Sequence, residues 1–336
     1  MIRATFELEP HGSAEALAIE ESTGMRTGPE FVRGSVVSER DGVAVLEFPD
    51  GNWGRNLPLL LSALVAGEGV ETRAFTRCRL IDLELPGGFL PGPAFGALGH
   101  RGVGLILKPS LGLSPADCAR IAEAAGEAGA DLVKDDELLG DPEWCPLEAR
   151  VAAVASVLHP SVVYCPNITG ATETLVERAR RVVDLGAGGV MVNAFAQGLD
   201  AVRALRDADL GVPVLAHRVG SGPWARNDRF GVSSAVLARL TRLAGADYVL
   251  VGAYGGKLFD TDADVDAQVA AVRSPSGRAR PATAVLGGGV SPANARAQVD
   301  RAGGSGLLAL LGSAAYTWPG GDVAAAVRAT VEAVRG

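Results

Sequence analysis

The sequence is poor in cysteine, has no long apolar run and carries no excess of positive charge, and each of these scarcities excludes a class of protein. Its four cysteines form no CxxC pair and no zinc-ligand spacing, so we expect reduced, mostly buried thiols in a cytoplasmic protein. No apolar stretch is long enough to span a bilayer. We expect no signal peptide, because Met1 leads directly into an alternating, strand-like run.

The 39 acidic residues outnumber the 31 basic ones, and the net charge of -8 argues against nucleic acid and anionic membranes as main partners.

What the chain has in quantity is apolar sequence for a large core. Hydrophobic residues fill 48% of the 336 positions, so a well-packed core is expected and disorder is not. The length suits a barrel with a small companion domain better than one average domain.

Residues 1–95 predict a small α+β domain. Strand-like and helical segments follow one another there in the order βαββαβ, which is typical of a ferredoxin-like fold, an open sheet with helices on one face. A Pro- and Gly-rich stretch at 86–93 then marks a boundary. The expected strands are 2–8, 32–38, 43–48 and 72–83, and the expected helices are 13–22 and 57–64.

Residues 96–336 predict a catalytic (β/α)8 TIM barrel, so the fold class is α/β. Eight apolar runs alternate with Ala- and Arg-rich helical sequence such as 116–128, 172–185 and 323–334, and this alternation indicates a parallel sheet. Eight units match a closed barrel and favour it over the alternative, an open doubly wound sheet. The eight runs are 103–107, 132–133, 162–164, 190–192, 212–216, 248–251, 282–286 and 307–311.

The segment 129–137, Gly-Ala-Asp-Leu-Val-Lys-Asp-Asp-Glu, carries the strongest chemical signal. An apolar run leads directly into Lys134, Asp136 and Glu137, so we expect a buried strand to end in a lysine and two carboxylates. Two carboxylates suit a hard divalent cation such as Mg²⁺. The lysine fits as a ligand only if its ammonium charge is removed, for example by carbamylation with CO2. The alternative is a solvated charge cluster just past a strand.

Polar residues and glycines also follow the other predicted strands, and in a barrel the C-terminal strand ends form the mouth where chemistry takes place. Taken singly, they have ordinary explanations: Lys108 as a surface lysine, His217 and Arg218 as a structural pair, and the glycines as turns. Their convergence on one mouth favours function. They are Lys108 after the first strand, Asn167 and Asn193 after the third and fourth, His217 and Arg218 after the fifth, Lys257 after the sixth, Gly287, Gly288 and Gly289 after the seventh, and Gly312 and Ser313 after the eighth.

The glycines after the last two strands predict a phosphate site. Barrels often bind phosphate at this place through free backbone N–H groups and the N-terminus of a short helix. Gly289 and Gly312 would let the backbone approach the anion closely.

Three motifs resemble those of the RuBisCO large-subunit family, and the chain is more similar to its RuBisCO-like proteins than to the carboxylases. Residues 108–114, KPSLGLS, resemble the family's KPxxGLS motif, and residues 129–137 resemble its specific metal motif, GxDxxKxDE. Glu20 opens a segment similar to the ESSTG-type segment that a partner subunit contributes across a dimer interface. The resemblance covers nearly the whole chain, because the groups after strands five to eight follow in the family's order.

The resemblance implies a role for each of these residues and a homodimer or higher homo-oligomer. Lys134, carbamylated by CO2, would hold Mg²⁺ together with Asp136 and Glu137. The others would act on the substrate: Lys108 as the proton-transfer group, His217 and Arg218 on substrate oxygens, Lys257 on a lid loop, Gly288, Gly289, Gly312 and Ser313 at a phosphate, and Glu20 in the partner's active site.

Several positions depart from the carboxylase pattern. Met25 and Arg26 replace a Thr-Trp pair, and Ser110 replaces the second lysine of the first motif. Glu68 aligns with an Asn that orients substrate and gas in carboxylases.

Two further departures concern the second phosphate pocket. Leu250 stands where a histidine is expected, and Gly287 stands where a serine is expected. The substrate is therefore expected to carry at most one phosphate, or a carboxylate in that place. Carboxylation of a bisphosphate is not expected.

Together these features predict an Mg²⁺-dependent enolase or isomerase, because enediolate chemistry is what is left when carboxylation is removed. The expected substrate is a monophosphorylated keto sugar or a related anionic metabolite. One alternative is a decarboxylase or related lyase of a sugar-acid-derived β-keto acid, where loss of CO2 yields the same enediolate. Another is a non-catalytic ligand-binding protein on a decayed barrel. The presence of all four of Lys108, Lys134, Asp136 and Glu137 disfavours this alternative.

Overall fold

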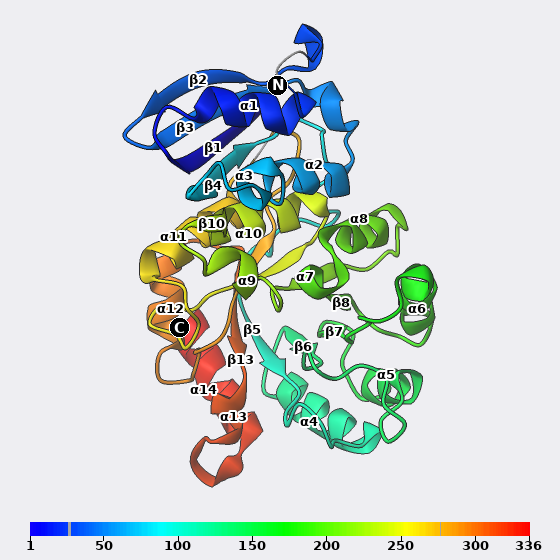
Figure 1. Cartoon of the computed structure of the whole chain (residues 1–336). Coiled ribbons are helices and arrows are strands. Elements are labelled where there is room, and N and C mark those ends of the chain that lie inside the picture. Colours follow the sequence, from blue (N-terminus) through cyan, green and yellow to red (C-terminus); the bar gives the residue numbers. More distant parts are fainter. Residues whose placement is uncertain (26–27, 276) are drawn as a thin grey trace.

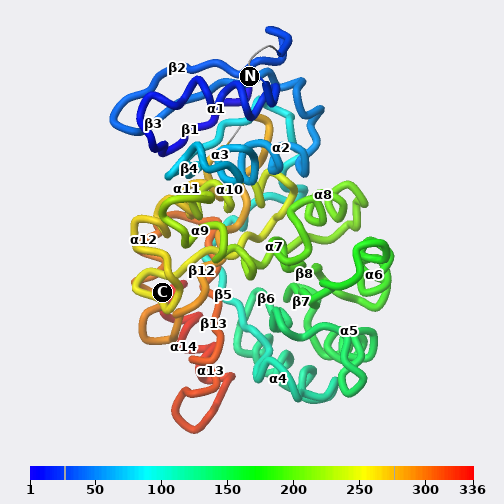
Figure 2. Tube along the Cα trace, in the orientation of Figure 1, coloured from blue at the N-terminus to red at the C-terminus, as the bar shows by residue number. Residues whose placement is uncertain are grey.

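The computed structural model describes residues 1–25, 28–275 and 277–336, which form a small domain set against a larger barrel (Figure 1). The N-terminus lies in the small domain and the C-terminus beside the barrel (Figure 2). Arg26, one of the departures named above, lies outside the described residues. Among those residues, no helix has the length and apolar character that crossing a bilayer requires.

The small domain has the predicted βαββαβ order. Its strands lie in the order β4-β1-β3-β2, each antiparallel to its neighbour, which confirms the ferredoxin-like arrangement. Side chains alternate along β1, so that one face of this strand is buried in the core. The elements are β1 (Ile2–Glu9), α1 (Ala14–Thr23), β2 (Ser35–Arg40), β3 (Val43–Phe48), α2 (Leu57–Leu64), α3 (Glu68–Glu71) and β4 (Arg77–Glu84), with 3-10 turns at Glu30–Val32 and Asp50–Trp53.

Two strands of this domain begin later than the sequence predicts. The chain forms a 3-10 turn up to Val32, and β2 starts only after Gly34. A side chain at Gly34 would meet the Phe48 ring and the Ala18 carbonyl oxygen at 2.6 Å, so only glycine passes this point. The expected strand 72–83 loses its first residues because the chain turns at 72–76, between the end of α3 and the start of β4.

The sequence does not predict one strand of the small sheet, which comes from the barrel half of the chain. β10 (Phe230–Val232) pairs in parallel with β4, opposite Cys78, Arg79 and Leu80. The predicted division at residue 95 falls in the connection between β4 and β5 (Arg101–Ile106). The small sheet itself therefore draws on both halves of the chain.

The second sheet is a closed barrel of eight parallel strands, as the sequence predicts. β13 pairs with β5, and β7 meets β8 through a bridge between Asn167 and Met191. Two strands have the predicted bounds, and the other six differ only at their ends. Besides β5, the strands are β6 (Leu132–Lys134), β7 (Val163–Cys165), β8 (Val190–Asn193), β9 (Val214–His217), β11 (Tyr248–Val251), β12 (Thr283–Leu286) and β13 (Leu307–Leu311).

Helices cover the outside of the barrel, as the Ala- and Arg-rich segments predict (Figure 1). They are α4 (Pro115–Glu127), α5 (Leu147–Ala155), α6 (Leu175–Asp184), α8 (Leu199–Asp207), α10 (Ser234–Ala244), α11 (Asp262–Arg273), α12 (Ala295–Ala302) and α14 (Val323–Arg335). Shorter helices follow the C-terminal ends of three strands: α7 (Ala194–Gln197) after β8, α9 (Gly222–Ala225) after β9 and α13 (Ser313–Tyr316) after β13, and 3-10 turns lie at Thr172–Thr174 and Pro319–Gly321.

Apolar side chains fill the inside of the barrel below its mouth. Leu132, Met191, Leu215, Val285 and Leu308 come from five different strands, and all are fully buried. A barrel filled in this way is a packed core and not a pore. This packed core therefore supports the C-terminal strand ends that form the mouth of the barrel.

A capping box fixes the end of the loop that follows β5. The Ser114 hydroxyl accepts a hydrogen bond from Asp117 N at 3.2 Å, and the Asp117 carboxylate accepts one from Ser114 N at 3.2 Å. Two of the unpaired N–H groups at the start of α4 are satisfied in this way. The loop between this cap and β5 carries Lys108.

Glu21 makes the stability of the small domain depend on pH. Its carboxylate accepts a hydrogen bond from Gly69 N at 2.9 Å, and burial raises the pKa of Glu21 from 4.5 to about 7. Between these two values the folded state holds a proton that the unfolded state releases. The free energy of unfolding should therefore fall as pH rises through this window.

We expect Glu21→Gln to remove this contribution, because the amide keeps an acceptor for Gly69 N but does not titrate. Urea unfolding at pH 5 and pH 7.5 measures the difference in the free energy of unfolding between the two pH values. Glu15→Gln, on an exposed position of the same helix, is the matched control. An equal pH dependence in the wild type and Glu21→Gln would show that Glu21 is ionised in the folded protein.

Candidate active site

A cavity of about 360 Å³ opens at the C-terminal ends of the barrel strands. The structure brings most of the predicted site residues to its wall. Nine of them line this one cavity: Lys108, Glu137, His217, Arg218, Lys257, Gly288, Gly289, Gly312 and Ser313.

The metal motif stands at the end of β6, where the sequence predicts it. Lys134 is fully buried, its Nζ donates a hydrogen bond to the Asp135 carbonyl oxygen at 2.7 Å, and it lies 3.7 Å from Glu137 Oε2. Burial lowers the pKa of the Lys134 ammonium, although the charges of Glu137 and Asp136 act in the opposite direction. The environment thus moves this lysine toward the neutral amine.

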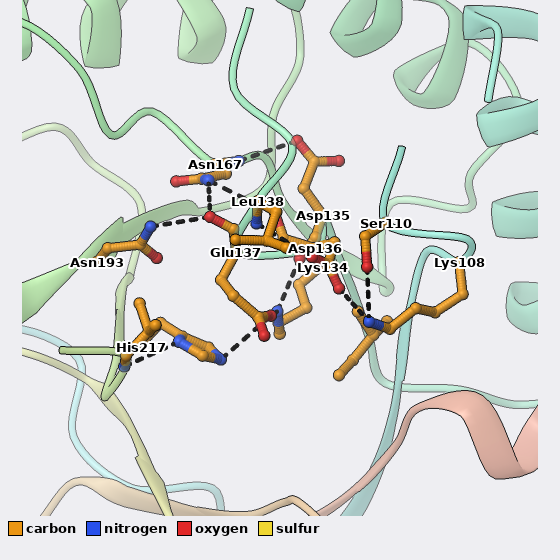
Figure 3. Close-up of polar contacts among 12 residues, drawn as sticks. Lys108, Ser110, Lys134, Asp135, Asp136, Glu137, Leu138, Asn167, Asn193 and His217 are labelled. Carbon is orange, nitrogen blue, oxygen red and sulfur yellow. Dashed lines mark hydrogen bonds and ion pairs between the residues drawn. The ribbon is translucent and has the colours of Figure 1, made fainter. Parts of the chain in front are cut away.

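Lys108 and His217 approach the two carboxylates from opposite sides (Figure 3). The Lys108 ammonium forms an ion pair with Asp136 Oδ2 and donates a hydrogen bond to Ser110 Oγ at 3.0 Å. His217 Nε2 lies 3.4 Å from Glu137 Oε2. These contacts join three strand ends into one polar cluster.

The hydrogen bonds of His217 define its protonation. Its Nδ1 accepts a hydrogen bond from Val219 N at 3.1 Å, so the proton of the neutral ring is assigned to Nε2, which faces Glu137. Burial, with the positive charges of Lys134 and Arg218, lowers the pKa of His217 well below its ordinary value. The ring is therefore a neutral hydrogen-bond donor toward the cavity.

Asp135, between the metal-motif residues, points away from the mouth and anchors the strand. Its carboxylate accepts hydrogen bonds from Tyr164 OH at 2.8 Å, Arg150 Nε at 3.0 Å and Asn167 N at 2.9 Å. Asp135 and Arg150 are both fully buried. Because side chains alternate along a strand, fixing Asp135 outward turns Lys134 and Asp136 inward.

Asparagines at the ends of two further strands fix the backbone of the motif. Asn167 Nδ2 and Asn193 Nδ2 donate hydrogen bonds to the Glu137 carbonyl oxygen at 3.0 and 2.9 Å. The sequence places both at the strand ends but does not predict this role.

A tyrosine that the sequence analysis does not name holds the first strand end. Tyr316, at the end of α13, accepts a hydrogen bond from Lys108 N at 3.0 Å and donates one to the Ile106 carbonyl oxygen at 2.8 Å. It thus fixes the backbone that carries the Lys108 side chain. No sequence pattern marks it, because it lies 208 residues from its partner.

A compositional signal for the site is nevertheless present. The chain has only three lysines, Lys108, Lys134 and Lys257, and all the remaining residues among its 31 basic ones are arginines. All three lie at the barrel mouth. An amine can lose its proton, whereas a guanidinium cannot, so the retention of lysine here indicates a chemical use.

The donor atoms fit a hard divalent cation. Asp136 Oδ2, Glu137 Oε2 and Asn193 Oδ1 are buried oxygens that make no conventional hydrogen bond. The two carboxylate oxygens have only the ion-pair contacts with Lys108, Lys134 and His217 described above, and hard cations prefer oxygen ligands. Within the described ranges, no group of three or more His, Cys, Asp and Glu side chains has the arrangement of a metal site. Two carboxylates alone are too few, and a carbamate on Lys134 would supply the third anionic ligand.

The glycine turn after β12 is shaped by a close backbone contact. Gly289 has φ 155°, and a Cβ there would meet Gly256 Cα at 2.7 Å. Lys257 N donates a hydrogen bond to the Gly288 carbonyl oxygen at 2.8 Å, which holds the segment after β11 against this turn. Packing alone therefore requires Gly289.

Gly312 has a different surrounding. A Cβ at this position would meet only the end of the Ile106 side chain, at an ordinary 3.6 Å. Packing does not require a glycine here, and the position faces the cavity beside Ser313. This leaves room for a ligand against the backbone.

Arg218 and Glu20 are not seen in the substrate-binding surroundings that the sequence predicts. The Arg218 guanidinium is bound by Asp260, which the sequence analysis does not name. Glu20 lies on α1 of the small domain and is not among the described residues that line this chain's own cavity. The substrate-binding roles of both stay predictions.

Comparison with known proteins places this geometry in a family. The family described as the ribulose bisphosphate carboxylase large chain, catalytic domain, matches residues 94–335. A ribulose bisphosphate carboxylase-like protein of Allochromatium vinosum is 36% identical over 309 residues, which cover 84% of this chain and 66% of that protein. The crystal structure of a rubisco-like protein from Burkholderia fungorum has a TM-score of 0.88 at 26% identity, with 99% of this chain and 93% of that chain covered.

Two relatives carry names of reactions. The 3-oxo-isoapionate-4-phosphate transcarboxylase/hydrolase of Xanthobacter autotrophicus is 36% identical over 269 residues, covering 74% of this chain and 64% of that protein. The 2,3-diketo-5-methylthiopentyl-1-phosphate enolase of Geobacillus kaustophilus is 37% identical over 229 residues, covering 62% and 54%. The matched parts thus span roughly half to two thirds of these curated relatives. With the closed barrel, the small antiparallel sheet and the lysine–carboxylate cluster, these similarities establish that the chain belongs to the RuBisCO large-chain family and fits its RuBisCO-like, form IV, branch.

Proposed function

We propose that the protein catalyses enolisation of a monophosphorylated keto sugar or related metabolite, or isomerisation through the enediolate, and that it does not carboxylate a bisphosphate. The observation that carries this proposal is the contact between the Lys108 amine and Asp136 of the metal motif. It puts a potential base beside the place where a substrate carbonyl would be polarised. Relatives named for reactions of keto phosphates support the same chemistry.

The metal motif would work with Mg²⁺ and CO2. Once Lys134 is neutral, its nitrogen can attack CO2, forming a C–N bond and releasing one proton, and the carbamate would join Asp136 and Glu137 as a ligand. Burial of Lys134 favours the neutral amine that this step needs. When bound, the cation supplies a Lewis acid that polarises the substrate carbonyl.

The protein's own groups would then move the proton. Lys108, as a neutral amine, would take the proton from the carbon next to the carbonyl. The Nε2–H of His217 would donate a hydrogen bond to a substrate oxygen. The backbone at Gly312 and Ser313 would hold the single phosphate. Lys257, on the segment after β11, would act on the substrate as the lysine of a lid loop.

A decarboxylase is the second candidate, because the Xanthobacter autotrophicus relative is named as a transcarboxylase/hydrolase. Loss of CO2 from a β-keto acid leaves the same enediolate, so the same groups would serve. Incubation with keto sugar phosphates in D2O, with Mg²⁺ and bicarbonate, separates the candidates. Deuterium entering the substrate carbon supports enolisation, and CO2 release from a keto sugar acid supports decarboxylation. Absence of both with folded protein would point to a non-catalytic binding role.

Lys134→Ala should abolish activity while the fold is retained, because the third anionic ligand is lost. Since the chain has only three lysines, ¹³C-bicarbonate should give one lysine carbamate resonance in the wild type, beside any resonance of the α-amine. Only the lysine resonance should disappear in Lys134→Ala. Lys257→Ala is the control and should keep the resonance. Removal of divalent cations with EDTA should also stop the reaction. Full activity of Lys134→Ala without added small acids would exclude the metal-site assignment.

Lys108→Ala should keep metal and ligand binding but lose roughly two to four orders of magnitude in rate, the usual effect of removing a general base. Lys108→Arg is the matched variant, since arginine keeps the charge but cannot give up its proton. Both should lose deuterium exchange at the substrate carbon. Exchange at the wild-type rate in either variant would move the base elsewhere, first to Lys257 or His217.

The protein should form at least a homodimer in which Glu20 of the small domain completes the partner's site. We expect Glu20→Gln and Lys134→Ala each to be inactive alone. Co-expression of the two should restore about a quarter of the wild-type activity, since half of the randomly paired dimers would hold one intact site. No recovery despite mixed dimers, or a fully active monomer by light scattering, would contradict this arrangement.

A further inference from the structure

A second buried charge pair in the cavity wall lies at Arg218. Asp260, which directly precedes the cap of α11, accepts hydrogen bonds from Arg218 Nη1 at 2.7 Å and from Nη2 at 3.2 Å. The Asp260 side chain is 1% exposed and that of Arg218 is 11% exposed. A two-pronged contact between desolvated groups neutralises the guanidinium.

Further contacts hold Asp260 in place. Its Oδ1 also accepts hydrogen bonds from Ser234 Oγ at 2.8 Å and from Gln268 Nε2 at 2.9 Å. Gln268 Oε1 in turn accepts one from Arg218 Nη1 at 3.0 Å. If Arg218 turned toward a ligand, it would leave a buried carboxylate unpaired, which is strongly unfavourable.

The surroundings of this pair are apolar. The Phe259 ring lies 5.4 Å from the Arg218 guanidinium carbon, and Val219, Leu250 and Leu258 line the same cavity. A second phosphate placed here would lose its water and face the Asp260 carboxylate. Of the cavity's lysines, Lys108 is paired with Asp136, and Lys257 lies on an exposed segment.

We propose that Asp260 is a specificity-determining residue, which neutralises Arg218 so that this side of the cavity accepts an uncharged, largely apolar end of the substrate. Three of the five guanidinium N–H groups are engaged by Asp260 and Gln268, so the others can donate to a neutral carbonyl or hydroxyl oxygen. The substrate class is a monophosphate whose far end carries no charge. This inference rests on the proposed function, because the glycine backbone must hold the one phosphate.

Three phosphates that need no turnover test the proposal by isothermal titration. They are methyl phosphate, pentyl phosphate and pentane-1,5-diyl bisphosphate, of which the last two differ only in the far end. The wild type should bind pentyl phosphate about tenfold or more tightly than methyl phosphate, because the chain buries apolar surface. It should also bind pentyl phosphate more tightly than the bisphosphate.

Two variants assign this preference to the named residues. Asp260→Asn should raise the affinity for the bisphosphate relative to pentyl phosphate about tenfold or more, since it leaves Arg218 with a net charge. Phe259→Ala, at a position that is 38% exposed, should reduce the advantage of pentyl over methyl phosphate. Asp266→Asn, on an exposed position of α11, is the control and should change neither ratio.

The proposal is overturned if the wild type binds the bisphosphate as tightly as pentyl phosphate, if folded Asp260→Asn leaves that ratio unchanged, or if none of the three ligands binds. Should Asp260→Asn fail to fold, an unchanged ratio in Phe259→Ala overturns it instead. The proposed function is judged separately by deuterium exchange. Deuterium exchange together with tighter binding of the bisphosphate would refute only the specificity. Absence of exchange together with tighter binding of pentyl phosphate would refute only the reaction.

Discussion

The site depends on one buried amine. Lys134 is fully buried at the end of β6, close to Glu137, and its inward direction depends on how this strand is oriented. Asp135, paired behind the sheet with the equally buried Arg150, supplies that constraint. Loss of either partner would leave an unpaired charge in the core and release the strand end. The ion pair between Asp135 and Arg150 on the outer face of β6 thereby helps to orient Lys134 and Asp136 on the inner face.

Three of the cationic side chains at the mouth have a carboxylate beside them: Lys108 has Asp136, Lys134 has Glu137, and Arg218 has Asp260. Apart from Lys257, the proposed anionic substrate would therefore meet little free positive charge from side chains. Backbone N–H groups at the glycine turns would then be the natural place for its phosphate. Lys108 and a divalent cation would compete for the same Asp136 carboxylate, so occupancy of the metal motif and the state of the base are coupled.

Periodicity in the sequence was enough to predict the barrel, and strands such as 248–251 and 307–311 have the predicted bounds, because each is a continuous apolar run. β10 escaped prediction because Phe230–Val232 has no period of its own and is a strand only beside β4. In the site, residues at the strand ends were predictable from position and motif. Asp260 and Tyr316 were not, since their roles come from contacts with residues 42 and 208 positions away.

The distribution of basic residues has a practical consequence. The outer surface carries its positive charge on arginine, while the three lysines are gathered at the mouth. Every lysine amine of the sequence therefore lies at the candidate site. Acylating reagents, aldehydes and amine-directed crosslinkers, which on most proteins react all over the exterior, would here modify Lys257 and Lys108 at the mouth, whereas Lys134 is fully buried. Chemical attachment to a support or a dye would have to use other functional groups if the site is to stay open.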